Sequence, residues 1–133
     1  MIWLGVAALA AIAAGFLLAQ YARAYVRRVE QRWPAEGHFI DAAGVQLHVL
    51  EAGDAAAPRV LLIHGASANL RELWHPLADG LTSDHRVIAF DRPGYGHSTR
   101  PRRGAQHLGV QAKMAAAVLR SSGDGPAIVV GHS

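Results

Sequence analysis

The stretch RVLLIHGAS, residues 59–67, sets a pattern that returns as RVIAFDRPGYGHS at residues 86–98 and as AIVVGHS at residues 127–133. Each copy begins with a short apolar run and ends in a turn rich in small residues. An uninterrupted apolar run of about four to eight residues is typical of a strand buried on both faces. We therefore predict buried strands over residues 59–63, 86–90 and 128–130.

Helical patterns separate these strands. Apolar residues at helical spacing predict a helix between the first two strands, with one face formed by Leu70, Leu73, Trp74, Leu77 and Leu81. Asn69 and Glu72 have the spacing of a capping box, while Pro76 favours a regular helix that begins later, with proline in its first turn. A second helix is predicted over residues 106–122, ended by Gly123. Alternating strands and helices predict an α/β fold with a mostly parallel sheet and flanking helices.

A hairpin precedes the first of these strands. Residues 38–41 and 45–50 are short β-prone runs, and Ala43–Gly44 lies between them as a turn. Residues 53–58 form a loop of small residues that leads into the strand at 59–63. The sequence contains no internal repeat beyond the strand-and-turn pattern itself.

Two of the strand-end loops have the composition of catalytic loops. Residues 64–66, His-Gly-Ala, follow the first strand, where glycine lets the backbone approach a substrate and the next N–H can point at a developing oxyanion. Residues 131–133, Gly-His-Ser, are half of a Gly-x-Ser-x-Gly turn that exposes a serine Oγ. Taken singly, the first loop is more simply a tight turn with a hydrogen-bonded histidine, Ser67 is a cap as readily as a catalyst, and a strand that ends in Gly-x-Ser is common.

The loop at residues 91–98 is predicted to be compact and fixed, because a proline and two glycines restrict it. Asp91 is expected to accept backbone N–H bonds inside this loop. The residues that define the pattern are Asp91, Pro93, Gly94, Gly96 and Ser98.

In this order, each at the end of a strand, the three motifs resemble the N-terminal half of the α/β-hydrolase fold, in its bacterial esterase/lipase and haloperoxidase-like branch. The resemblance covers residues 37–133. It implies that Ser133 is the nucleophile, that Gly131 and His132 shape the turn before it, and that the loop at 91–98 is a structural signature. The oxyanion loop that it implies consists of His64, Gly65 and Ala66, with the Ala66 N–H as one donor.

The reaction that the resemblance implies is acyl transfer from an ester-type bond to water, with no metal and no organic cofactor. Asp91 precedes Ser133, whereas the family order is serine, acid, histidine, so Asp91 is not expected to be the triad acid. Serine at the turn disfavours the dehalogenases and epoxide hydrolases of this fold, which use aspartate there. A small, lipophilic ester is the expected substrate class.

The triad acid, the triad histidine, the second oxyanion donor and the later strands are expected to lie beyond residue 133. Residues 1–133 alone are therefore expected to lack triad-dependent turnover, and half a sheet disfavours independent folding. Two classes of function remain. One is a membrane-anchored serine hydrolase of which this is the N-terminal part, and the other is a non-catalytic remnant or a membrane-bound interaction module on the hydrolase scaffold.

The N-terminal segment has the composition of a membrane span. Residues 2–19 are eighteen positions without a charge, and at ~1.5 Å per residue they reach ~27 Å, close to the thickness of a bilayer's hydrocarbon core. We predict a transmembrane anchor over residues 1–22, a basic stalk and linker over residues 23–36 ended near Pro34, and the hydrolase part over residues 37–133. The rival interpretation is a cleaved signal peptide, which would need a positive segment before the apolar run.

Charge is concentrated beside that span. The formal net charge is +3, but from Trp33 onward nine basic residues face nine acidic ones. A juxtamembrane basic cluster predicts a single-pass protein with its hydrolase part in the cytoplasm, and it argues against nucleic-acid binding. The chain has no cysteine. The remaining histidines show no ligand spacing and are expected to be structural or exposed: His38, His48, His75, His85 and His107.

Overall fold

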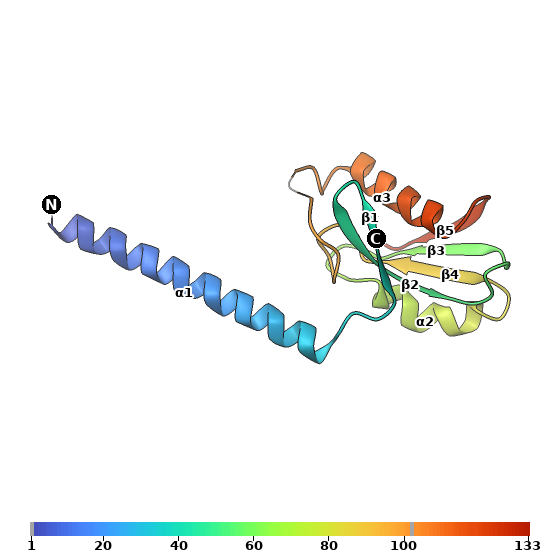
Figure 1. Cartoon of the computed structure of the whole chain (residues 1–133), viewed down its shortest axis with the longest axis horizontal. Coiled ribbons are helices and arrows are strands. Elements are labelled where there is room, and N and C mark those ends of the chain that lie inside the picture. The colour runs from blue at the N-terminus through green and yellow to red at the C-terminus, as the bar shows by residue number, and fades with distance from the viewer. Residues whose placement is uncertain (1, 102) are drawn as a thin grey trace. The chain divides into compact units, whose positions relative to one another are not determined.

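The computed structural model describes residues 2–101 and 103–133. The chain divides into two compact units, one up to Ala35 and one over Glu36–Ser133, which are taken separately. Its elements, labelled in Figure 1, are α1 (Ile2–Arg32), β1 (His38–Ala42), β2 (Val45–Ala52), β3 (Arg59–Ile63), α2 (Arg71–Leu81), β4 (Arg86–Phe90), α3 (Leu108–Ser121) and β5 (Ala127–Gly131).

The first unit is the helix α1. It runs without a break from the apolar segment through the basic segment, as the sequence predicts, and the Trp33 N–H closes its last turn on the Val29 carbonyl at 2.8 Å. Pro34 then ends it, because the residue before proline is disfavoured in the helical region. Among the described residues, the helix Trp3–Arg32 is long and apolar enough to cross a membrane, since it contains an 18-residue stretch with a mean hydropathy of 1.9. A signal sequence near an N-terminus meets the same criterion.

The second unit is built on a five-stranded sheet in the order β1-β2-β4-β3-β5. The predicted hairpin is confirmed: β1 and β2 pair antiparallel through Ala43 and Gly44, whose φ values of 55° and 79° are those of a type I′ turn. β2 also pairs antiparallel with β4, while β3 pairs parallel with both β4 and β5. The sheet is therefore mixed, not mostly parallel, because the hairpin adds two antiparallel pairings to the predicted parallel core.

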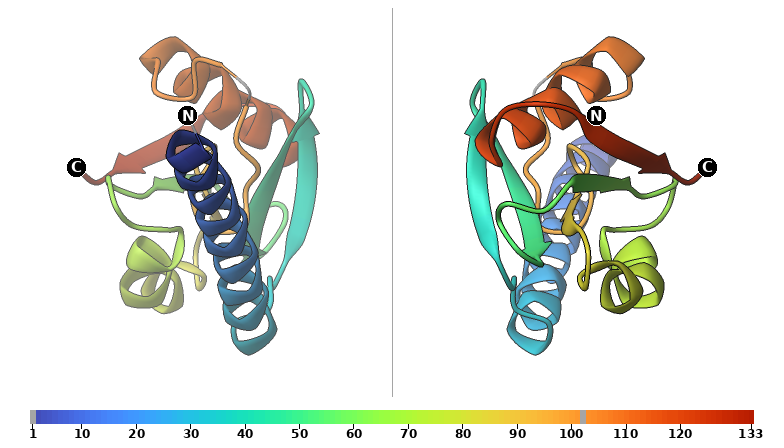
Figure 2. Two further views of the ribbon diagram at one scale, coloured as in Figure 1. Left: turned by 90° about the vertical axis from the view of Figure 1, so that its left-hand side faces the viewer. Right: turned by 90° about the vertical axis from the view of Figure 1, so that its right-hand side faces the viewer.

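Two hydrophobic cores lie on the two faces of the sheet, and Figure 2 shows α2 and α3 on opposite sides of it. Successive strand residues point to opposite faces, so β2, β3 and β4 each contribute to both cores. The core under α3 contains Leu47, Val49, Leu61, Ile88, Phe90, Met114 and Val118. The core under α2 contains Leu50, Val60, Leu62, Leu70, Ala78, Val87 and Ala89. Because both faces of the sheet are covered, the prediction that β3 and β4 are strands buried on both faces is confirmed.

Three predictions about elements are wrong. β5 is the predicted third strand, but its side chains are largely exposed, with Ile128 and Val129 each at 53 %. Pro76 lies in the second turn of α2 and not the first, since the Trp74 N–H already bonds the Leu70 carbonyl. The apolar face of α2 therefore outweighs the hydrogen bond that proline removes. The second helix begins at Leu108, two residues later than predicted.

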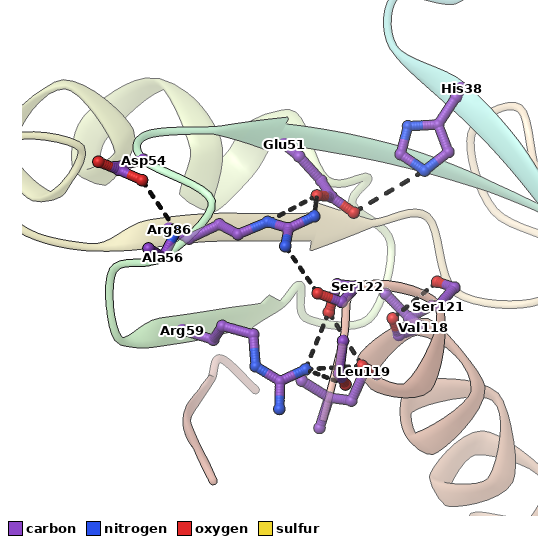
Figure 3. Close-up of polar contacts among 11 residues, drawn as sticks. His38, Glu51, Asp54, Ala56, Arg59, Arg86, Val118, Leu119, Ser121 and Ser122 are labelled. Atoms are coloured by element: carbon purple, nitrogen blue, oxygen red, sulfur yellow. Dashed lines mark hydrogen bonds and ion pairs between the residues drawn. The ribbon is translucent and has the colours of Figure 1, made fainter. Parts of the chain in front are cut away.

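Arg59 joins β3 to the end of α3, as Figure 3 shows. Its side chain is buried, and its guanidinium donates to the carbonyl oxygens of Leu119 at 2.8 Å and Gly123 at 2.6 Å and to Ser122 Oγ at 3.2 Å. The last carbonyl groups of a helix have no partner within the helix, and a cation near them also interacts favourably with the negative end of the helix dipole. Arg59 thus holds α3 and the turn that follows it against the sheet.

We expect Arg59→Met to lower the free energy of unfolding by about 2–3 kcal/mol, because it removes several charged hydrogen bonds from a buried guanidinium to part-buried carbonyl groups. Arg120→Met, on the exposed side of the same helix, is the matched control and should change it by less than about 0.5 kcal/mol. The midpoint of urea unfolding of the intact protein measures both. Equal losses in the two variants would contradict this role of Arg59.

Candidate active site

The register of the sheet brings the three predicted loops to one edge. Ile63 at the end of β3 lies opposite Phe90 of β4 and opposite Gly131 of β5. The three strands are parallel, so the residues that follow them leave the sheet at the same edge. This is where ligands bind in open α/β sheets. The sequence-predicted residues 64–66, 91–98 and 131–133 are therefore neighbours.

The loop after β3 lies directly against the turn that carries Ser133. The His132 N–H bonds the Ile63 carbonyl at 3.0 Å, which extends the β3–β5 pairing past the last strand residue. A Cβ at Gly65 would lie 3.1 Å from His132 Nδ1 and 3.4 Å from the Ser133 carbonyl carbon. A methyl group at position 65 would therefore be tight against the His132 ring, so glycine at this position allows the loop to lie close to the Ser133 segment.

His64 is a buried structural clamp and not a free base. Its Nε2 accepts the Arg92 N–H at 3.0 Å, so Nδ1 carries the proton and donates to the Gly65 carbonyl at 2.8 Å. Burial lowers the pKa of His64 below its ordinary value and outweighs the opposing hydrogen bond to Gly65. The ring is therefore neutral at neutral pH, with both nitrogens in use.

The clamp on Gly65 fixes the direction of the Ala66 N–H. The Gly65 carbonyl accepts from His64 and also from Arg92 Nη2 at 3.1 Å. That carbonyl and the Ala66 N–H belong to one trans peptide, so they point in opposite directions. The N–H is thereby aimed away from His64 and Arg92, and Ala66 is exposed. Ser67 follows with a φ of 63°, a left-handed conformation that is rare for a residue with a side chain.

Asp91 organises the loop after β4. Its carboxylate is buried and accepts the His97 N–H at 2.9 Å, which confirms the predicted bond inside the loop, and the Leu70 N–H before α2 at 2.9 Å. Ser98 Oγ donates to the Asp91 carbonyl at 2.6 Å. Gly96 has a φ of 49°, and a Cβ there would lie 2.1 Å from Asp91 Oδ2. Asp91, Gly96 and Ser98 therefore fold the loop around the Asp91 carboxylate.

His48 on β2 completes this network, and the sequence identified it only as structural or exposed. Its Nδ1 donates to Asp91 Oδ2 at 2.8 Å, and its Nε2 donates to the Glu36 carbonyl. Burial lowers the pKa of His48, but the bonds to Asp91 and Glu36 outweigh it, so the pKa lies above its ordinary value. Both nitrogens carry protons, and His48 and Asp91 form a buried ion pair. The signal in the sequence was a lone polar residue within the apolar run 47–50.

Glu72, which the sequence assigned to a capping box, contacts the site instead. Its Oε2 accepts the Gly65 N–H at 2.9 Å and its Oε1 lies 3.2 Å from His132 Nδ1. The bond from Gly65 lowers the pKa of this carboxyl, so it is an anion at neutral pH. The capping box is therefore wrong; Asn69 Oδ1 accepts the Arg71 N–H at 3.0 Å without help from Glu72.

The described side chains form no cluster of metal ligands. Across residues 2–101 and 103–133, no three His, Cys, Asp or Glu side chains form a group that could hold a metal ion. The His48–Asp91 and Glu72–His132 pairs each join one histidine to one carboxylate. The site described so far consists of backbone donors, one serine and these pairs.

The buried His48–Asp91 pair makes stability depend on pH at both ends. The raised pKa of His48 means that its contribution is complete below the ordinary value of 6.5 and is lost as pH rises through the folded value. The lowered pKa of Asp91, where hydrogen bonds outweigh burial, gives a contribution to stability that is complete above pH 3.8 and is lost as pH falls through the folded value.

We expect urea midpoints to fall from pH 6 to 9 in the wild type, but not in His48→Gln. His75→Gln, at an exposed histidine, should keep the wild-type slope; a wild-type slope in His48→Gln would contradict the pairing.

Comparison with known proteins agrees with this geometry. Residues 58–133 match the family model of the alpha/beta hydrolase fold. The chain is 38 % identical over 89 residues to the lipase LipV of Mycobacterium tuberculosis, covering 67 % of this chain and 33 % of that protein. It is 39 % identical over 62 residues to epoxide hydrolase A of the same organism, covering 47 % of this chain and 19 % of that protein. The chain thus spans a third or less of the length of these two relatives.

A solved structure extends the likeness to the N-terminal helix. The crystal structure of a membrane phospholipase A, described as a bacterial virulence factor, is 32 % identical with a TM-score of 0.64, and the match covers 99 % of this chain and 43 % of that one. Because α1 and the sheet unit are both inside the match, the likeness is not confined to the hydrolase sheet. The fold, the three loops and the family match lead to one conclusion: this chain belongs to the α/β-hydrolase fold family.

Proposed function

We propose that the protein is a serine hydrolase that cleaves ester-type bonds by acyl transfer to water, with Ser133 as the nucleophile. The observation that carries the proposal is the contact of Gly65 with the His132–Ser133 segment, which sets a prepared backbone loop beside the serine. Ser133 is exposed at the sheet edge where the three loops meet. A serine at this position, where dehalogenases and epoxide hydrolases of the fold use aspartate, supports an acyl-enzyme route.

In this mechanism Ser133 Oγ attacks the ester carbonyl carbon while the general base takes its proton, and the Ala66 N–H donates to the developing oxyanion. The base gives that proton to the leaving alkoxide. Water then attacks the acyl-enzyme, the base takes a proton from the water and returns it to Ser133 Oγ, and the acid is released. Neither His48 nor His64 suits the role of base, because each has both ring nitrogens committed to structural bonds. The proposal assigns the base and its carboxylate partner to the part of the protein outside these 133 residues.

Lipophilic esters are the proposed substrates. The relatives named as a lipase and as a membrane phospholipase A support this class. We further propose that residues 2–19 of α1 cross the membrane and that the basic residues after them keep the hydrolase part on the cytoplasmic side. Such an enzyme would meet its substrates at the bilayer surface. The membrane span alone would place the enzyme there, and no lipid-binding site on α1 is proposed.

We expect Ser133→Ala to lower kcat for p-nitrophenyl esters roughly 10⁴-fold or more in the intact protein that contains this chain, because no other group supplies the nucleophile. A fluorophosphonate probe should label the wild type but not this variant. Ser83→Ala, at an exposed serine of a distant turn, is the control and should keep both properties. Persistent probe labelling of Ser133→Ala would refute the assignment of the nucleophile.

The membrane proposal has its own test. We expect the protein to stay in the pellet after carbonate extraction of membranes, and its hydrolase part to resist protease added to intact spheroplasts. Removal of residues 2–22 should release it to the soluble fraction, since the apolar span is then lost. A mature N-terminus near Tyr25, read by mass spectrometry, would instead establish a cleaved signal sequence.

A further inference from the structure

We propose that Glu72 is a positioning residue that holds the oxyanion loop, residues 64–66, against the turn that carries Ser133. Its catalytic consequence rests on the proposed function, while its structural part can be tested without any activity. Glu72 lies in the first turn of α2, outside the motifs by which the sequence pointed to a hydrolase.

The contacts of Glu72 run to both halves of the site. One carboxylate oxygen accepts the Gly65 N–H at 2.9 Å, and the other lies 3.2 Å from His132 Nδ1, next to Ser133. The side chain is about one-third exposed. A charged acceptor makes a shorter and stronger bond to an N–H than a neutral one. Glu72 therefore bridges Gly65 and His132, which are 67 positions apart in the chain and are brought together by the pairing of β3 with β5.

Gly65 needs such a bridge because it has no side chain to restrict it. A glycine backbone rotates more freely than any other residue, so its two flanking peptides must be held from outside. Glu72 holds the peptide before Gly65 through its N–H, while His64 and Arg92 hold the peptide after it through its carbonyl. The three contacts together fix the rotation at Gly65 and, with it, the direction of the Ala66 N–H.

The two holders of the carbonyl are themselves restrained, whereas the N–H depends on Glu72. His64 packs edge-on against Tyr95 with ring centroids 5.3 Å apart, and the Arg92 guanidinium lies 4.9 Å from the same ring. Loss of Glu72 would leave these contacts in place and free only the peptide that carries the Gly65 N–H. The expected defect is a misdirected loop in a folded protein. Such a defect affects the transition state more than substrate binding.

The structural part is tested by the amide of Gly65. Within these 133 residues a histidine followed by a glycine occurs once, at 64–65, so ¹³C′-histidine and ¹⁵N-glycine labelling selects this amide in the NMR spectrum. In detergent-solubilised protein we expect Glu72→Ala to raise its hydrogen exchange about 10-fold or more and to shift its proton upfield. Glu72→Gln, which keeps an acceptor oxygen, should retain most of the protection. An amide with the same exchange rate and shift in Glu72→Ala would overturn the proposal, whatever the activity.

The catalytic part is tested by the division of the effect between kcat and KM. We expect Glu72→Ala to lower kcat for p-nitrophenyl esters about 10- to 100-fold, less than the roughly 10²–10³-fold loss when one oxyanion donor is removed outright, and to change KM less than about 3-fold. Glu72→Gln should recover most of kcat. Asp79→Ala, which removes an exposed carboxylate from the same helix, should match the wild type. Rates in Glu72→Ala within 2-fold of the wild type would overturn the catalytic role.

The outcomes separate this inference from the function on which it rests. If the wild type and Ser133→Ala hydrolyse esters equally slowly, the proposed function fails, and the Gly65 amide still decides whether Glu72 holds the loop. If the wild type is active and labelled at Ser133 but Glu72→Ala is unimpaired, the function stands and the positioning role fails. A parallel fall in the urea midpoint of Glu72→Ala and Asp79→Ala would assign any loss to general destabilisation and count against the proposal.

Discussion

The Asp91 carboxylate is the group on which the arrangement of the second unit depends. It ends β4, accepts the Leu70 N–H before α2, closes the loop at 91–98 through His97, and pairs with His48 of β2. One buried anion thus joins two strands, a helix start and a loop. Without these donors its burial would be prohibitive, so the donors and the carboxylate depend on each other.

The candidate site is assembled from the loop that Asp91 holds and from the end of β5. The loop held by Asp91 offers the Arg92 N–H and guanidinium, and these fix His64 and the Gly65 carbonyl. The loop after β3 is therefore supported by Arg92 of the neighbouring loop, by its own His64 and by Glu72 of α2. Ser133 approaches from β5, whose contact with β3 continues to the His132 N–H. The proposed site thus draws on the ends of three strands and on one helix.

The sequence predicted the order of elements better than the contacts that join them. Apolar runs and turn glycines identified β3, β4 and the three loops, because those features are local. His48 bonds Asp91, 43 positions away, while Glu72 bonds Gly65, 7 positions away, and lies beside His132, 60 positions away; no local pattern specifies these partners. Pro76 and the exposed β5 were misjudged for the same reason: packing of a whole helix face and coverage of a strand are properties of the assembled unit.

The His48–Asp91 pair also bears on how β2 finds its place beside β4. Residues 47–50 are buried on both faces, so apolar burial discriminates poorly between one strand register and its neighbours. A slip by one residue would set an aliphatic side chain against the Asp91 carboxylate, and His48 and Asp91 would lose each other as partners in the core. A buried polar group that loses its hydrogen-bond partner costs about 1–3 kcal/mol. A single polar pair in an apolar strand therefore makes mispairing unfavourable, and it encodes alignment that hydrophobicity alone leaves ambiguous.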